Sequence, residues 1–238
     1  NRTAQVTITD NDTGKLSITA TTATASEPST NGQFAINLDN PTQYPLQVTY
    51  NVAGNATANN DYLALTGTAT IPAMSSSVNV DVTVLNNNIP ENPETVILTL
   101  TGPNNTLFSI DTTNGHDTAT VTINDEDPDP LVSVSDVSIN EGDTGSQTLT
   151  FTISLSDISA KTATVDYTLT DGSASVGEDY AAGSGSLTFN PGETSKTVDV
   201  TVYGDLLPEA DETINLVLSN PLNLSLTDDT GVATIIDN

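Results

Sequence analysis

The amino-acid sequence predicts an all-β protein that consists of two tandem β-sandwiches of immunoglobulin type. Three observations carry this prediction: apolar and polar residues alternate with a period of two in many short segments, turn-forming residues separate those segments, and one long pattern occurs twice. Thr, Val and Ile favour strands, whereas Asn, Asp and Gly favour turns. Runs of Ala, Leu, Glu and Lys at helical spacing are absent. Half of the 238 residues suffices to bury an independent core.

The expected strands follow from the period-two segments, seven in each repeat. In the segment around Val80, alternate residues are Val, so Val80, Val82 and Val84 should face the core while their neighbours face water. Aromatic residues recur at equivalent strand positions, which favours core packing: Phe34, Tyr50, Phe151 and Tyr167. The first repeat should have strands near 15–26, 32–38, 46–52, 67–72, 78–84, 95–100 and 117–124, and the second near 132–139, 147–155, 163–169, 184–189, 196–203, 213–218 and 231–236.

The internal repeat defines the domains. Residues 54–100 align without gaps on residues 172–218. A strand with an acidic tail occurs three times, at residues 6–12, 121–127 and 233–238. We therefore expect the closing strand of a preceding repeat at residues 1–12, a first repeat at 13–127 and a second repeat at 128–238.

The charge of the chain excludes some classes of partner. The formal net charge is −27, from 31 acidic and 4 basic residues. Such a surface repels phosphate backbones and anionic lipids, so we expect binding neither to nucleic acids nor to a membrane surface. No apolar stretch approaches the roughly 20 residues that cross a bilayer, so we also expect no direct membrane insertion. The chain has no cysteine, which excludes disulfides and thiol chemistry. The acids could simply form a solvated surface, or they could bind cations, and their positions decide between these readings.

The acidic residues recur at fixed positions beside strand ends. Calcium needs six to eight hard oxygen ligands, and a sandwich can supply them where several loops meet at one end. The first repeat offers Glu27, Asp61, Glu91, Glu94, Asp125, Glu126 and Asp127, and the second offers Glu141, Asp179, Asp205, Glu209, Glu212 and Asp237. Because so many carboxylates at one end repel one another unless cations neutralise them, this recurrence favours Ca²⁺ binding.

The order and spacing of these motifs resemble the Calx-beta domain. The second repeat shows Gly172-x-Ala174, Asp179-Tyr180, Gly185-x-Leu187-x-Phe189-x-Pro191-Gly192-Glu193, Val202-x-Gly204-Asp205 and Glu209-x-x-Glu212-Thr213. The family is known from sodium–calcium exchangers, integrin β4 and very large bacterial surface adhesins. The resemblance implies a seven-stranded sandwich with calcium at one end, beside the link to the next domain.

The first repeat departs from this pattern at one ligand position. The aspartate before the paired glutamates is Asp205 in the second repeat, whereas the first repeat has Asn87 there. An amide oxygen can still bind calcium, but one formal charge is lost, so the first repeat should bind fewer ions or bind them more weakly. We also expect the truncated acidic tail at Asn238 to leave the second site incomplete.

Two signals for catalysis are weak. His116, the single histidine, lies in a polar turn without a counterpart in the second repeat. The pairs Glu91/Glu94 and Glu209/Glu212 could be mistaken for glycosidase carboxylates, but their occurrence in both repeats favours metal ligation. We therefore expect no enzymatic activity.

The sequence thus indicates calcium-binding extender repeats of an extracellular or cell-surface protein, such as an adhesin or filament. Calcium would stiffen the domain ends and the linker at residues 125–130, whose prolines limit bending further. The partners would be neighbouring repeats of the same polypeptide, with self-assembly or an adhesion target in addition. A regulatory calcium-sensor pair and a carbohydrate-binding accessory module of a secreted enzyme remain as alternatives. A carbohydrate-binding module requires an exposed aromatic platform. The chain has no Trp and few other aromatic residues, so it offers little for such a platform.

Overall fold

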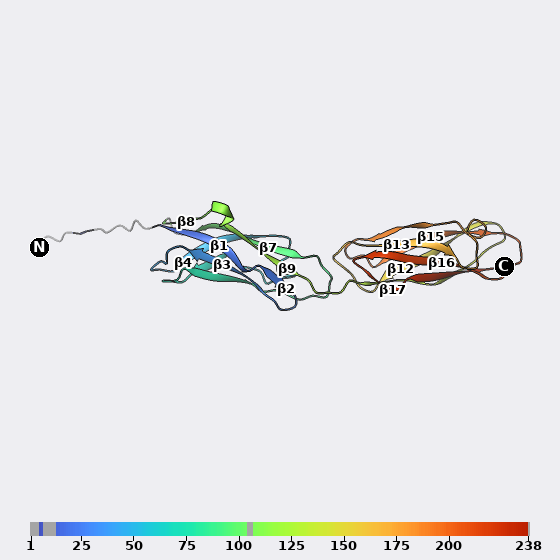
Figure 1. The fold of residues 1–238 in the computed structure, drawn as a ribbon, viewed down its shortest axis with the longest axis horizontal. Coiled ribbons are helices and arrows are strands. Elements are labelled where there is room, and N and C mark those ends of the chain that lie inside the picture. Colours follow the sequence, from blue (N-terminus) through green and yellow to red (C-terminus); the bar gives the residue numbers. More distant parts are fainter. Residues whose placement is uncertain (1–4, 7–12, 104–106, 238) are drawn as a thin grey trace. The chain divides into compact units, whose positions relative to one another are not determined.

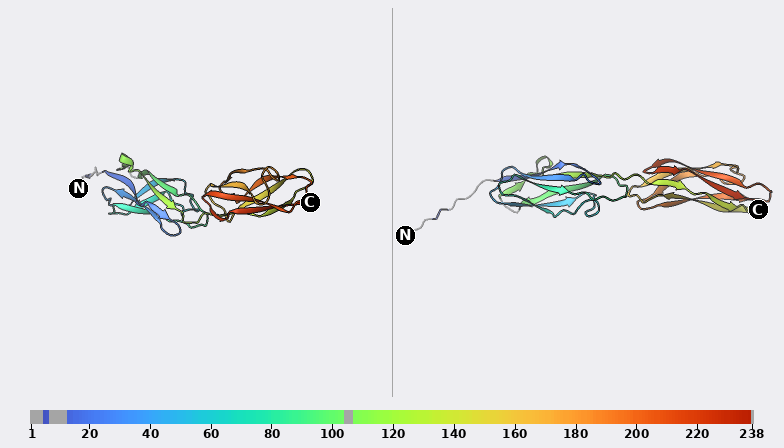
Figure 2. Two further views of the ribbon diagram at one scale, coloured as in Figure 1. Left: turned by 45° about the vertical axis from the view of Figure 1, so that its right-hand side comes forward. Right: turned by 90° about the horizontal axis from the view of Figure 1, so that it is seen from below.

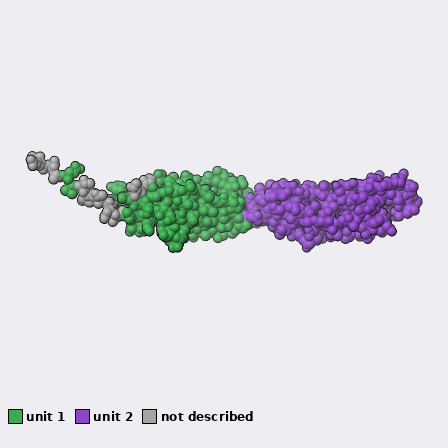
Figure 3. Space-filling view, turned by 90° about the horizontal axis from the view of Figure 1, so that it is seen from above, with its two compact units in different colours: residues 1–88, 93–126 green, residues 89–92, 127–238 purple. Residues whose placement is uncertain are grey.

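The computed structural model describes residues 5–6, 13–103 and 107–237. The internal contacts divide the chain into two compact units, coloured separately in Figure 3. The first unit comprises residues 1–88 and 93–126, and the second comprises residues 89–92 and 127–238. The short segment 89–92 therefore belongs to the first repeat by sequence and to the second unit by its contacts. The expected closing strand at residues 1–12 falls almost entirely outside the described residues.

Both units are built almost entirely of strands (Figure 1). The first unit contains β1 (Gly14–Thr22), β2 (Thr24–Ser26), β3 (Gly32–Leu38), β4 (Leu46–Ala53), β5 (Thr68–Ile71), β6 (Ser77–Val82), β7 (Glu94–Pro103), β8 (Phe108–Ile110) and β9 (Thr118–Asn124). The second contains β10 (Leu131–Val134), β11 (Val137–Asn140), β12 (Gly145–Leu155), β13 (Ala163–Asp171), β14 (Ser184–Phe189), β15 (Ser195–Gly204), β16 (Glu212–Leu222), β17 (Ser225–Asp228) and β18 (Thr230–Ile236). A short 3-10 helix, η1 (Thr113–Gly115), precedes β9. No helix in the described part of the chain is long and apolar enough to span a membrane.

Each unit is a sandwich of a four-stranded and a five-stranded sheet, whose layers can be followed from two further sides in Figure 2. The first unit has the strand orders β6-β3-β1-β8 and β2-β9-β7-β4-β5. The second unit repeats this topology as β15-β12-β10-β17 and β11-β18-β16-β13-β14. The same connectivity in both units confirms the all-β sandwich class that the period-two segments predict.

The first strand of each repeat differs from the expectation. The segment expected as one strand at 15–26 is divided into β1 and β2, which lie in different sheets. β1 pairs antiparallel with β3, whereas β2 pairs parallel with β9. The buried positions change from even numbers (Leu16, Ile18) to an odd number (Ala25) between β1 and β2, so a break in the period of two accompanies the change of sheet. The short edge strands β8 and β17 were not expected, because three or four residues carry too little periodicity.

The two cores are separate and equivalent. Val80, Val82 and Val84 are buried, as the alternation predicts, and so are Phe34, Tyr50 and Phe151. Tyr167 is partly buried and packs against the core of the second unit. Each sandwich therefore has a hydrophobic cluster of its own to hold its loops in place.

Glycine begins the loop that carries Asp61, and equally the loop that carries Asp179. Gly54 has a φ of +117°, and a Cβ placed on it would overlap the backbone oxygen of Thr95. A Cβ on Gly172 would meet Thr213 in the same way. The same oxygens accept hydrogen bonds of 3.1 Å from the backbone nitrogens of Ala56 and Ala174, respectively. This close approach fixes each loop against the residue that follows Glu94 or Glu212.

We expect Gly54→Ala to destabilise the first unit by about 1–3 kcal/mol more than Gly115→Ala. Both glycines have a positive φ, which costs an alanine roughly 1–2 kcal/mol, but only Gly54 also faces a backbone collision, worth about 1–3 kcal/mol. Gly115 has open space where a Cβ would lie, so it is the matched control. Urea unfolding followed by circular dichroism measures both losses, and equal losses would contradict the close approach.

Candidate metal centres

The loops that carry Asp61 and Asp179 have the same local structure. The backbone nitrogen of Asp61 donates to the oxygen of Thr57 (3.0 Å), and the nitrogen of Thr57 donates to Asp61 Oδ2. In the second unit, Asp179 and Ser175 make the same two hydrogen bonds, at 3.0 and 2.7 Å. Each aspartate therefore closes its own turn with one carboxylate oxygen, and the turn holds the other oxygen in a fixed direction.

Asp61 is the most informative acid in the first repeat. Its side chain is buried, with 3% of the residue exposed, and its Oδ1 accepts no hydrogen bond from the described residues. Oxygens of Asp61, Glu91 and Glu94 lie within 4.8 Å of one another. A buried ionised oxygen without a donor costs several kcal/mol unless a cation or a proton compensates it. The arrangement therefore fits a ligand that brings positive charge.

The second repeat places its equivalent acids together as well. Oxygens of Asp179, Glu209 and Glu212 lie within 4.8 Å of one another. Partial burial raises the pKa of Glu212 to about 7, and Asp179, Glu209 and Glu141 contribute to that shift. Burial, followed by the charges of Asp205, Asp179 and other acids, also raises the pKa of Glu209. Without a cation, this cluster holds protons more tightly than ordinary carboxylates do.

Glu27 and Glu141 contribute a buried carboxylate from the end of the first strand segment. Both residues are almost fully buried, at 5% and 6% exposure. The backbone nitrogen of Asn87 donates to Glu27 Oε2 (3.2 Å), and the backbone nitrogen of Asp205 donates to the Glu141 carboxylate. Burial and then the charges of Asp205, Glu209 and Asp237 raise the pKa of Glu141. The residues that the repeat alignment pairs thus occupy equivalent places in the two units.

The remaining sequence-predicted residues lie at the margins of these clusters. Asp205 is exposed, and its Oδ1 accepts a hydrogen bond from the backbone nitrogen of Leu207 (2.6 Å). Asp237 is half-buried and close enough to Glu141 and Glu209 to raise the pKa of both. Asp125 and Asp127 are half-buried and Glu126 is exposed. None of these three residues is among the mutually close oxygens that the described residues form.

Glu178 is a neighbour of the second cluster that the sequence did not single out. Its charge contributes to the raised pKa of Glu209. The first repeat has Asn60 at the matching position, so a comparison of the two repeats gave no signal there. The signal that the sequence does offer is the position of Glu178 directly before Asp179, in the loop that begins at Gly172.

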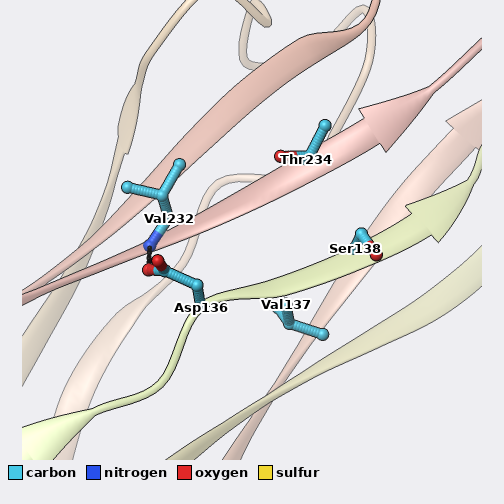
Figure 4. A pocket seen from close by; sticks show the side chains of 5 residues that line it. All are labelled: Asp136, Val137, Ser138, Val232 and Thr234. Atoms are coloured by element: carbon cyan, nitrogen blue, oxygen red, sulfur yellow. Dashed lines mark hydrogen bonds between the residues drawn. The ribbon is translucent and has the colours of Figure 1, made fainter.

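Two further polar features among the described residues lie outside the clusters, the turn around His116 and a depression over β11 and β18. His116 Nδ1 lies 2.9 Å from Asp111 Oδ2, and Thr113 Oγ1 donates to Asp111 Oδ1 (2.6 Å). These hydrogen bonds hold the pKa of Asp111 well below its usual range and fix the turn at η1. An open depression of about 350 Å³ lies over β11 and β18 (Figure 4). Its one acid, Asp136, accepts a hydrogen bond from the backbone nitrogen of Val232 (2.8 Å), so this carboxylate serves the strand pairing.

The residues of both clusters fit a calcium ion. Each combines carboxylates from separate loops, and calcium accepts such oxygens at 2.3–2.6 Å in flexible geometry. The fit is supported by the buried Oδ1 of Asp61 and by the raised pKa of Glu212. Both observations indicate that each cluster carries more negative charge than its surroundings neutralise.

The chain is similar in sequence to parts of known proteins. Adhesion G-protein coupled receptor V1 of Danio rerio is 30% identical over 188 residues, which cover 70% of this chain and 3% of the receptor. Sodium/calcium exchanger 3 of Homo sapiens is 43% identical over 61 residues, which cover 26% of this chain and 7% of the exchanger. The chain therefore spans only a small part of these relatives.

Solved structures of tandem and single domains are also similar. The structure of CBD12 from CALX1.2 covers 92% of this chain and 99% of its own, with 17% identity and a TM-score of 0.39. The apo-form Calx CBD1 domain covers 46% of this chain and 97% of its own, with 23% identity and a TM-score of 0.43. The family described as Calx-beta domain matches residues 9–127 and 131–238. Because these two matches include nearly the whole chain, this protein belongs to the Calx-beta domain family.

Proposed function

We propose that this chain binds Ca²⁺ at the acidic clusters of both repeats and catalyses no reaction. The observation that carries the proposal is the buried carboxylate of Asp61, whose Oδ1 has no hydrogen-bond donor among the described residues although it lies close to Glu91 and Glu94. Calx-beta is a family of binding domains, which supports a role without catalysis.

Calcium suits these clusters better than magnesium. Magnesium requires near-ideal octahedral geometry and gives up its water reluctantly, whereas calcium accepts six to eight oxygens in a flexible arrangement. The ligands of the second repeat come from several loops: Glu141, Asp179, Asp205, Glu209, Glu212 and Asp237. Loops of this kind supply many oxygens without strict angles. The first repeat has Asn87 in place of Asp205 and therefore binds calcium more weakly or with fewer ions.

The biological role that we propose is an extender segment of an extracellular or cell-surface protein. Residues 125–130 are nearly all acid or proline, so calcium bound by Asp125 and Asp127 would stiffen this linker. Neighbouring repeats of the same polypeptide are the partners in this role. The similarity to an adhesion receptor extends over 70% of the chain, whereas the similarity to an exchanger extends over 26%, and this favours the extender over a regulatory sensor.

We expect calcium to raise the melting temperature, and to do so more at pH 8 than at pH 5. A site saturated at a hundredfold excess over Kd contributes about 2.7 kcal/mol, or roughly 10 °C for a unit of this size. In EDTA the folded pKa of Glu212, about 7, lies above its ordinary value of 4.5, so the protonated form stabilises the fold. That stability is lost as the pH rises from about 4.5 to about 7. The affinity for calcium rises over the same range, because the carboxylates lose the protons that compete with the ion.

Calorimetric melts in calcium and in EDTA across this pH range measure both effects. Glu212→Gln should flatten the pH dependence in EDTA and remove the calcium response of the second unit. Glu193→Gln is the control, because Glu193 pairs with Lys196 (2.7 Å) and is not a candidate ligand. Identical melts with calcium and EDTA at pH 8 would exclude functional calcium sites.

The extender role predicts that calcium narrows the range of shapes of the chain. Without calcium, the acids of residues 125–129 repel one another and the linker samples many conformations. Small-angle scattering should show a narrower distribution of maximum dimensions in calcium than in EDTA. Asp127→Ala should weaken this effect and leave both units folded, whereas Asp228→Ala, at an exposed position on β17, should not. Equal scattering in calcium and EDTA would contradict the extender role even if calcium binds.

A further inference from the structure

The second unit exposes an apolar loop beside its acidic cluster. Leu206 and Leu207 follow β15 and are 74% and 64% exposed. The same loop carries the candidate ligands Asp205 and Glu209, and Pro208 between them is exposed as well. Adjacent exposed leucines are unusual on a chain with a net charge of −27. Exposed apolar side chains that lie together commonly mark an interaction site.

The internal repeat shows what happens to the equivalent loop of the first repeat. At the spacing that aligns residues 54–100 with 172–218, Ile89 matches Leu207 and Pro90 matches Pro208. Residues 89–92 form part of the second unit, where the oxygen of Pro90 accepts hydrogen bonds from Ala160 N (3.0 Å) and Ser159 Oγ (3.2 Å). Pro90 is buried, whereas Pro208 is exposed. The same loop is thus covered in one repeat and open in the other.

The loop that receives Pro90 is held in shape by its own unit. It lies between β12 and β13, and Ser159 within it is buried, at 4% exposure. The backbone oxygen of Ser159 accepts from the nitrogen of Gly192 (2.9 Å), and Ser159 Oγ accepts from the nitrogen of Lys161 (3.0 Å). Two donors, Ala160 N and Ser159 Oγ, therefore point to one external carbonyl from a preformed turn.

We propose that Leu206–Ala210 is the docking surface for a further Calx-beta unit that presents a loop like that of residues 156–161. The oxygen of Pro208 would accept the two hydrogen bonds that Pro90 accepts, and Leu207 would be covered as Ile89 is partly covered. The inference rests on the proposed calcium binding in one respect. Asp205 Oδ1 accepts a hydrogen bond from the backbone nitrogen of Leu207. A cation bound at Asp205 would therefore help to fix the conformation of the docking loop.

A chain of three units tests this surface without dissecting the protein. A second copy of residues 127–238 is joined directly after Asn238, which reproduces the junction at residues 126–127 because Asn238 aligns with Glu126. The chain has no cysteine, so Leu207→Cys in the original second unit introduces a single thiol. Its rate of alkylation in calcium is compared with that of the same substitution in the two-unit chain.

Docking predicts that the thiol reacts at least about tenfold more slowly in the three-unit chain, because the adjoining loop covers it. Tyr44→Cys, at a site that is 72% exposed in the first unit, should react equally in both chains. Ser159→Ala in the added copy removes one of the two donors to Pro208 and should restore the reactivity several-fold.

Equal alkylation rates at position 207 in the two chains would overturn the docking surface. If calcium still raised the melting temperature, calcium binding would stand and docking alone would fail. Slow alkylation without any effect of calcium on melting would support docking and contradict the proposed function. Protection of the thiol in the two-unit chain by neutral phosphatidylcholine vesicles, without protection in the three-unit chain, would assign the leucines to lipid and overturn the proposal.

Discussion

Repulsion among the carboxylates of the two acidic clusters is the interaction on which the candidate metal centres and the proposed function depend. Folding brings Asp179, Glu209 and Glu212 to within 4.8 Å of one another, and it buries Asp61 beside Glu91 and Glu94. Such clusters are stable only when protons or cations reduce their charge. Burial and the neighbouring acids raise the pKa of Glu212, so protons reduce the charge of the second cluster when no cation is bound. The sandwich supplies a rigid frame that holds the charges together, and in the proposed function a bound Ca²⁺ compensates them.

The fold was predictable because its signals are local and repeated. The alternation around Val80 and the recurrence of Phe34 at Phe151 identify core strands directly, and all of these residues are buried. The division of the first strand between two sheets was missed. β1 and β2 are nearly continuous in sequence, but their buried residues change from even positions (Leu16, Ile18) to an odd one (Ala25), and this break in period was the local signal for the change of sheet.

The candidate site was predictable only in part. The repeat alignment identified acids that the structure brings together, because matching positions in a common fold occupy matching places. It missed Glu178, which has no acidic counterpart in the first repeat. It could not show that Glu27 is buried and bonded to the backbone of Asn87, because that contact joins residues far apart in sequence. The grouping of residues 89–92 with the second unit likewise depends on tertiary contacts that no local pattern encodes.

The most direct test is to locate the cations themselves. Crystals grown in calcium, with anomalous diffraction collected at a long wavelength, would mark each bound ion independently of any change in protein shape. Calcium binding predicts anomalous peaks about 2.3–2.6 Å from carboxylate oxygens of Asp179 and Glu212, and of Asp61 and Glu94. Ordered loops without peaks at either cluster, or peaks confined to other surface acids, would contradict the view that calcium compensates the buried charge.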